Sequence, residues 1–226
     1  WFTWYDLMTT DVDGARDFYT KVLGWGIEMY EGADPDRPYP MWVAEAPMGG
    51  VMELPEEAAA AGAPPHWLAY IGADDVGAAA ARAEELGGRI EHRQQIPDVG
   101  EFAVVSDPQG AVFAIYEPSG EPPEGTAWPP GTGQVSWHEL ATTDYEAAFD
   151  FYAELFGWEV NDEMDMGDGW MYRMFGKSGM APFGGIFNKP PDVPVPGWLY
   201  YVRVADLDAA LDRVRQHGGA VVNGPQ

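Results

Sequence analysis

Hydrophobic and polar positions follow the same pattern twice along this chain. Residues 4–25 read WYDLMTTDVDGARDFYTKVLGW, and residues 137–158 read WHELATTDYEAAFDFYAELFGW, with eleven identities and no gap between the copies. Residues 67–90 match residues 198–221 in the same way, at a nearly equal offset along the chain. A repeat of this length predicts two tandem modules, each of ordinary domain size.

Within each copy the pattern alternates between strand and helix. Residues 2–10 are rich in aromatic and β-branched side chains, which is typical of a strand, and apolar residues then recur at helical spacing over residues 12–23. Asp11 is placed to cap this helix at its start and Gly24 to end it. Further strands are expected at 26–30, 41–46, 50–54, 67–72, 89–95, 102–106 and 111–117, with a second helix at 76–86. The fold class is therefore α+β, built from tandem βαβββ units with helices on one face of a mixed sheet.

Domain boundaries follow from the repeat and from one stretch of different composition. Residues 118–133 are rich in proline and glycine and have no hydrophobic period, which is typical of a linker. We expect a first module at 1–117 and a second at 134–226. The second module has no counterpart of residues 101–117, so its C-terminal strands are expected to be missing.

Composition limits the class of protein. The chain has 226 residues, of which 46% are hydrophobic, and this is enough for a buried core in each module. A formal charge of −25 would repel nucleic acid and anionic membranes, and no apolar run is long enough to span a bilayer. The absence of cysteine excludes disulfides, thiolate metal sites and cysteine nucleophiles. Because this composition suits a reducing compartment, we expect a soluble cytoplasmic protein.

The order of these motifs resembles the vicinal oxygen chelate superfamily. The resemblance lies in three motifs. The first is a strand followed by an Asp and a helix that carries FY and ends at GW, and the second is ADD or ADL before a helix that stops at Gly-Gly. The third is the DPQG turn. This superfamily includes glyoxalase I, bleomycin-resistance proteins, fosfomycin-resistance enzymes and extradiol dioxygenases. The resemblance implies two glyoxalase-like domains with cup-shaped sheets and helices outside, a small-molecule ligand, and a monomer with an internal pseudo-dimer or a homodimer.

The resemblance also implies where a divalent metal ion would bind. The superfamily's ligand positions correspond here to Trp4 and Trp137 on the first strands, Leu68 and Leu199 on the strands before the second helices, and Ala114. None of these side chains offers a lone pair to a divalent cation, so we expect no metal cofactor. The alternative is a metal-dependent glyoxalase-like lyase, isomerase or dioxygenase that holds Zn, Ni, Mn or Fe with His66, Glu53 and Glu139.

Two carboxylates are the candidate catalytic residues. Asp6 and Glu139 occupy the same position of the first strand in each copy and share a face with Trp4 and Trp137, whereas His138 points to the helix layer. A carboxyl walled by tryptophan can act as a general acid or base, or it can be neutralised by a partner such as Arg203. The expected ligand contacts are Trp4, Tyr70, Trp137, Tyr201, Arg203, Met52, Leu68 and Leu199.

These residues predict a metal-independent small-molecule-binding protein of the glyoxalase and bleomycin-resistance type. It would sequester a planar or aromatic ligand, or perform acid–base chemistry on it through Asp6 or Glu139. The enzyme class above is the second hypothesis, and a ligandless interaction protein is the third.

Overall fold

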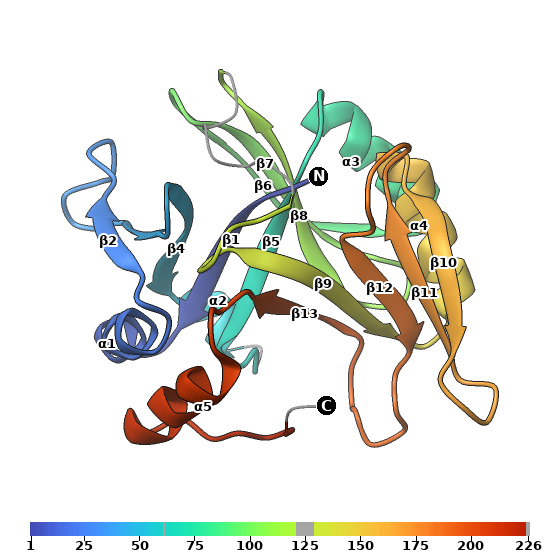
Figure 1. The fold of residues 1–226 in the computed structure, drawn as a ribbon. Helices are drawn as coiled ribbons and strands as arrows, with labels where there is room; N and C mark the ends of the chain where they lie inside the picture. The colour runs from blue at the N-terminus through green and yellow to red at the C-terminus, as the bar shows by residue number, and fades with distance from the viewer. Residues whose placement is uncertain (61, 121–128, 225–226) are drawn as a thin grey trace. The chain divides into compact units, whose positions relative to one another are not determined.

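A computed structural model describes residues 1–60, 62–120 and 129–224 (Figure 1). Over these residues the strands form an eight-stranded sheet in the order β2-β3-β4-β1-β5-β8-β7-β6 and a five-stranded sheet in the order β10-β11-β12-β9-β13. The strands are β1 (Phe2–Thr9), β2 (Gly26–Met29), β3 (Pro40–Val43), β4 (Pro47–Glu53), β5 (His66–Gly72), β6 (Arg89–Ile96), β7 (Gly100–Ser106), β8 (Val112–Pro118), β9 (Val135–Thr142), β10 (Glu159–Asp165), β11 (Met171–Gly176), β12 (Gly184–Asn188) and β13 (Gly197–Val202). The helices are α1 (Val12–Leu23), α2 (Glu56–Ala60), α3 (Val76–Glu85), α4 (Tyr145–Phe156) and α5 (Leu207–Gln216). The predicted α+β class is confirmed. Residues 121–128 of the expected linker lie outside the described residues.

The repeated helices begin with the same capping residue. Asp11, Asp75, Asp144 and Asp206 each accept a hydrogen bond from the backbone N–H three residues later, at the start of α1, α3, α4 and α5. This bond satisfies one of the N–H groups that a helix leaves unpaired at its N-terminus. At the other end of α1 and α4, Gly24 and Gly157 have φ angles of 75° and 65°, which glycine adopts without strain.

A glycine of β4 allows two strands to approach closely. Gly49 lies inside β4 and pairs with Tyr5 of β1. A Cβ on Gly49 would overlap the carbonyl oxygen of Tyr5, so glycine is needed at this position. The short helix α2 was not predicted, since its five residues bury no side chain.

The described chain divides into two compact units that each combine segments distant in sequence. Unit 1 holds Trp1–Thr3, residues 70–120 and Val135–Tyr201, and unit 2 holds Trp4–Ala69 with residues 129–134 and 202–224. The predicted boundaries at 117 and 134 stay a prediction. None of the described helices is both long and apolar enough to cross a membrane.

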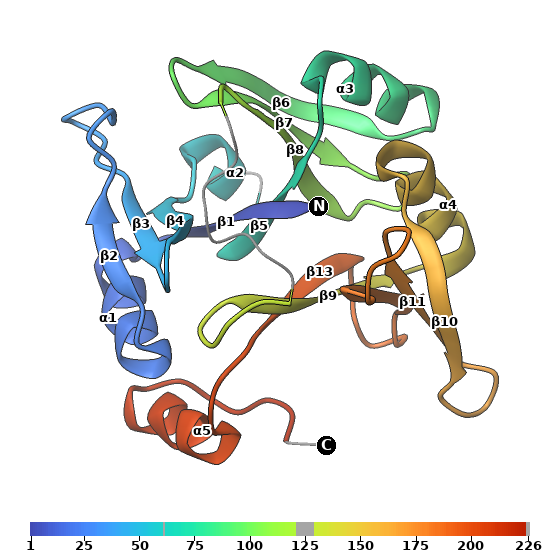
Figure 2. The same cartoon turned by 45° about the horizontal axis from the view of Figure 1, so that its top comes forward.

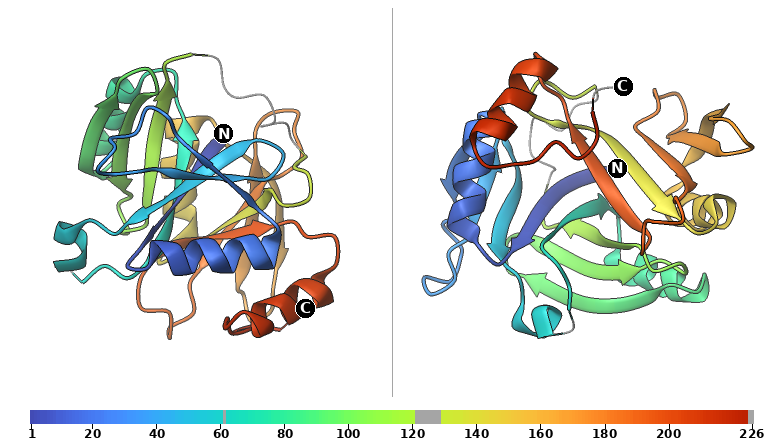
Figure 3. Two further views of the ribbon diagram at one scale, coloured as in Figure 1. Left: turned by 90° about the vertical axis from the view of Figure 1, so that its left-hand side faces the viewer. Right: turned by 90° about the horizontal axis from the view of Figure 1, so that it is seen from below.

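The buried core of unit 2 contains two tryptophans. Leu7, Trp25, Trp42 and Val51 form its buried core, and the apolar face of α1 packs on them. The indole N–H of Trp42 donates to the Gly50 carbonyl at 2.7 Å, so the polar edge of this buried ring is satisfied. Helix α5 lies beside α1 and contacts it (Figure 1; Figure 3, left).

Unit 1 has an aromatic core beneath α4. Trp158 and Phe175 stack at 4.4 Å between ring centroids, and Tyr152 of α4 also stacks on Trp158, at 5.4 Å. Helix α3 covers β6, β7 and β8 and lies next to α4 (Figure 2). An exposed ion pair between Arg82 and Glu154, at 3.0 Å, joins these two helices.

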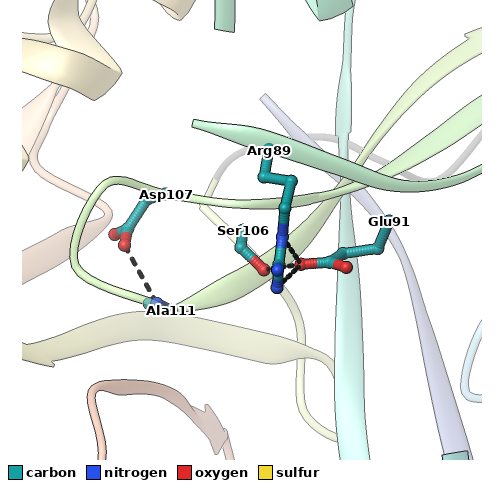
Figure 4. Close-up of polar contacts among 5 residues, drawn as sticks. All are labelled: Arg89, Glu91, Ser106, Asp107 and Ala111. Carbon is teal, nitrogen blue, oxygen red and sulfur yellow. Dashed lines mark hydrogen bonds and ion pairs between the residues drawn. The ribbon is translucent and has the colours of Figure 1, made fainter. Parts of the chain in front are cut away.

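The DPQG turn links β7 to β8 (Figure 4). Asp107 is buried and accepts hydrogen bonds from the N–H groups of Ala111 and Gln109, each at 2.9 Å. Burial raises the pKa of this carboxyl, although these hydrogen bonds act in the opposite direction. Nearby, Glu91 accepts from Arg89 and from the Ser106 hydroxyl, which ties β6 to the end of β7. These contacts give the turn a structural role.

Candidate functional site

The first candidate carboxylate, Asp6, is held by a tryptophan and a tyrosine within unit 2. Asp6 is only 3% exposed on β1. Its Oδ1 accepts from the Trp4 indole N–H at 3.0 Å and from the Tyr39 hydroxyl at 2.5 Å. The same indole N–H also donates to the Tyr39 hydroxyl at 2.7 Å. Trp4 and Asp6 therefore come together as predicted from their shared strand face, with Tyr39 as a third member.

The second candidate carboxylate, Glu139, has a matching arrangement within unit 1. The Tyr172 hydroxyl donates to Glu139 Oε1 at 2.7 Å and accepts from the Trp137 indole N–H at 2.7 Å. On the other side, the Tyr201 hydroxyl donates to Glu139 Oε2 at 2.6 Å. Both oxygens of the carboxylate thus have a hydroxyl donor. We call Trp137, Glu139, Tyr172 and Tyr201 the Glu139 cluster.

The two clusters are products of the internal repeat. Tyr39 and Tyr172 lie as far apart in the sequence as Asp6 and Glu139 do, so each tyrosine occupies the same position of its copy. Each tyrosine ring crosses a glycine of the neighbouring strand, Gly50 in β4 or Gly185 in β12, and a Cβ on that glycine would overlap the ring. The second glycine of each Gly-Gly pair thus allows the tyrosine to reach the carboxylate.

The tyrosines of the Glu139 cluster are protonated at neutral pH. The pKa of Tyr172 is raised well above the ordinary value, first by burial and then by the hydrogen bond to Glu139. The pKa of Tyr201, which is more exposed, is also raised, first by partial desolvation of its hydroxyl and then by its own hydrogen bond to Glu139. Both hydroxyls are therefore neutral donors at neutral pH. Because both donate to Glu139, the glutamate serves as the acceptor in this cluster.

Other predicted contact residues lie apart from these hydrogen bonds. Arg203 follows β13, and its guanidinium donates to the Pro130 carbonyl at 3.0 Å. Among the described residues, Arg203 forms no ion pair with either candidate carboxylate. The partner role expected of Arg203 is instead taken by tyrosine hydroxyls. Tyr70 is buried in β5 and packs its ring against Phe102 at 5.6 Å.

The remaining predicted contacts are aliphatic. Leu199 is exposed on β13 and, two residues before Tyr201, shares the face of the Glu139 cluster. Leu68 is buried in β5, and Met52 is half-buried in β4, where it pairs with Met8 of β1. These positions agree with an apolar face on each sheet, and their role as ligand contacts stays a prediction.

His138 is a packed histidine. It is 2% exposed, stacks on Phe2 with 3.8 Å between ring centroids, and its Nδ1 lies 2.8 Å from the Phe183 carbonyl. Burial lowers its pKa to about 3, so the ring is neutral and its Nδ1–H donates to that carbonyl. As expected for neighbours on a strand, His138 and Glu139 point to opposite faces.

The chain matches a family model at residues 1–115 and 134–226, and the model describes the Glyoxalase/Bleomycin resistance protein/Dioxygenase superfamily. The chain belongs to this superfamily. The match covers both copies of the repeat, and the resemblance noted from the motifs is confirmed.

Relatives in the superfamily carry several names. The chain is 31% identical over 224 residues to a Mycobacterium tuberculosis protein named "Putative glyoxylase CFP32", covering 98% of this chain and 84% of that protein. It is 31% identical over 235 residues to the anthracycline biosynthesis protein DnrV of Streptomyces peucetius, covering 98% and 83% of the two chains. Among solved structures, it resembles the Mn(II)-bound glyoxalase of Novosphingobium aromaticivorans with a TM-score of 0.63 and 18% identity, covering 96% and 70%.

The side chains of this chain do not fit the metal site that the superfamily implies. The corresponding positions hold Trp4, Trp137, Leu68, Leu199 and Ala114, and the structure places these residues on strands β1, β9, β5, β13 and β8. Their indole and aliphatic groups provide no lone pair for a divalent cation. Across the described ranges, no three His, Asp or Glu side chains are grouped to hold a metal ion.

Two residues of the clusters escaped the reasoning from sequence. Tyr39 lies between the strands expected at 26–30 and 41–46, and neither Tyr39 nor Tyr172 was among the expected ligand contacts. The usable signal was the constant offset between the copies, because a tyrosine is kept at the same position in both. The sequence could not show that each ring crosses a glycine to reach the carboxylate.

Proposed function

We propose that this protein binds a planar, aromatic small molecule without a metal ion, and that Glu139 is the residue that anchors it. The observation that carries the proposal is the Glu139 cluster: a half-buried carboxylate between two tyrosine hydroxyls on a face that also presents Trp137 and Leu199. Apolar and aromatic surface with a few fixed polar groups is the usual composition of a small-molecule site.

The sheet face around Glu139 supports an aromatic ligand. Side chains two residues apart on a strand share a face, and neighbouring strands keep that face in register. Gly185 pairs with Glu139, and Tyr172 pairs with Phe187, whose ring stacks on Tyr172 at 5.8 Å. A flat ligand placed here would meet ring faces and a carboxylate acceptor together. Two proteins that this chain is similar to, DnrV and DauV, are named anthracycline biosynthesis proteins, and these names are in keeping with a ligand of this shape.

The chemistry available to Glu139 is acceptance of a hydrogen bond or a proton. Its two tyrosine partners have raised pKa values and stay protonated, so they are poor proton acceptors near neutral pH. A ligand hydroxyl next to the carboxylate would therefore lose a proton only to Glu139. Asp6, in the equivalent cluster, is the second candidate for this role.

The test is isothermal titration calorimetry with a hydroxyanthraquinone. We expect Glu139→Gln to bind at least roughly tenfold more weakly, because the amide brings no charge to a charge-assisted hydrogen bond. The matched control is Glu159→Gln, which changes an exposed glutamate on β10 of the same sheet. Equal affinity of the Glu139 variant and the wild type would remove Glu139 from the site.

Metal dependence is tested on the same protein. Dialysis against a chelator should leave the affinity for the hydroxyanthraquinone unchanged, and addition of Zn, Ni, Mn or Fe should not increase it. A stoichiometric ion that raises the affinity, or that confers lyase or dioxygenase activity, would favour the metal-dependent alternative. Loss of that ion in His66→Ala would then place His66 among the ligands.

A further inference from the structure

The two oxygens of Glu139 are both occupied by protein hydroxyls. Tyr172 donates to Oε1 at 2.7 Å, and Tyr201 donates to Oε2 at 2.6 Å. A carboxylate oxygen can accept a second hydrogen bond, as Asp6 Oδ1 does, but a ligand donor that takes the position of one of these hydroxyls must replace it. The two tyrosines are held by different sets of contacts, and this difference indicates which one is easier to replace.

Tyr172 is held in place from three directions. Its hydroxyl accepts a hydrogen bond from the Trp137 indole N–H at 2.7 Å, in addition to donating to Glu139. Its ring stacks on Phe187, with 5.8 Å between centroids and 21° between planes. The ring also lies against the backbone of Gly185, where a Cβ would overlap it. Removing Tyr172 from Glu139 would break a second hydrogen bond and a ring contact.

Over the residues that the structure describes, the Tyr201 side chain has fewer such contacts than Tyr172 has. The side chain of Tyr201 is exposed, with 43% of the residue accessible to solvent. Among the residues that the structure describes, its hydroxyl bonds to Glu139 alone, and its ring stacks on no other ring. The backbone is secured separately in β13, where the Tyr201 carbonyl accepts from the Ser136 hydroxyl at 3.3 Å. The side chain can thus change rotamer into water without disturbing the strand.

We propose that a ligand binds by taking the place of the Tyr201 hydroxyl on Glu139 Oε2, while Tyr172 remains on Oε1. This inference rests on the proposed function of Glu139 and adds the chemical class of the ligand. Oε2 offers lone pairs and negative charge, so the ligand must bring an O–H or N–H donor beside its aromatic plane. Aromatic carboxylates and compounds whose polar groups only accept hydrogen bonds are rejected, because they would leave Glu139 facing a like charge or an unmatched acceptor.

The test compares two variants that delete one hydroxyl each from the same carboxylate. Isothermal titration calorimetry with a hydroxyanthraquinone is performed on wild type, Tyr201→Phe and Tyr172→Phe. We expect Tyr201→Phe to bind roughly 2- to 10-fold more tightly, because the ligand no longer breaks an internal hydrogen bond. Tyr172→Phe should bind at least roughly fivefold more weakly, because Glu139 loses its fixed donor and Trp137 its acceptor. Weaker or unchanged binding by Tyr201→Phe would overturn the proposal.

A change of ligand gives an independent check. The methyl ether of the hydroxyanthraquinone keeps the plane and loses the donor, and it should bind wild type at least roughly tenfold more weakly. Equal binding of the two compounds would also overturn the proposal. If Tyr172→Phe does not reach the wild-type circular dichroism spectrum, the Tyr201 variant and the methyl ether decide the matter. Should Glu139→Gln lose affinity while Tyr201→Phe does not gain it, only this inference fails, and the proposed function stands.

Discussion

Acid destabilisation through His138 is a direct consequence of its burial. The folded protein holds this ring with a pKa of about 3, whereas the ordinary value, which applies to the unfolded chain, is 6.5. As the pH falls below 6.5, the unfolded chain takes up a proton that the folded state refuses, so acid favours unfolding. The stabilising contribution is complete above pH 6.5 and is lost progressively as the pH falls towards about 3.

The size of this effect follows from the two pKa values. Between about pH 7.5 and about pH 5.5, the uptake of a proton by the unfolded histidine should lower the free energy of unfolding by about 1.4 kcal/mol. This range stays above the pI of 4.1, near which an acidic protein tends to precipitate. Other carboxylates also respond to pH, so the useful quantity is the difference between wild type and a variant that lacks the histidine.

The assay is urea unfolding of wild type, His138→Phe and His138→Gln at the two pH values. Both variants lose stability at neutral pH, because the hydrogen bond to the Phe183 carbonyl is lost or altered and the stack on Phe2 changes. That loss does not depend on pH. We therefore expect the gap between wild type and each variant to shrink by about 1.4 kcal/mol on acidification. Gaps that stay constant for both variants would refute the argument that His138 is neutral in the folded protein.

Two further variants test the local arguments. Asp144→Ala should lower the free energy of unfolding by about 1 kcal/mol in urea, because α4 loses the side chain that caps its N-terminus. The control is Asp150→Ala, which changes an exposed residue of the same helix. An equal loss of stability in both variants would contradict the capping role. Gly185→Ala should displace Tyr172 and weaken binding of a hydroxyanthraquinone as Tyr172→Phe does, whereas Gly197→Ala, whose Cβ meets no atom within 4 Å, should leave binding unchanged. Wild-type affinity in Gly185→Ala would show that the glycine does not position the tyrosine.

Local and repeated features of the fold were readable from the sequence. The bounds of α1 agree with the helical spacing between Asp11 and Gly24, because a capping side chain and a left-handed glycine act within a few residues of the chain. The duplication predicted the shared position of Asp6 and Glu139, and the order of the motifs carried the resemblance to the superfamily. The helix bounds and the shared position depend on periodicity and on the offset between copies, which a single chain displays in full.

The contacts of the candidate site were decided by the tertiary structure. The alternation of side chains along β9 placed Glu139 on the same face as Trp137. The same kind of reasoning suggested Arg203 as the partner of the carboxylate, whereas the hydroxyls of Tyr172 and Tyr201 take that role. Which side chain reaches the carboxylate depends on the register between strands, on which aromatic ring lies against a glycine, and on where the chain turns after β13. These are relations between residues distant in sequence, and hydrophobic periodicity within one strand contains no information about them.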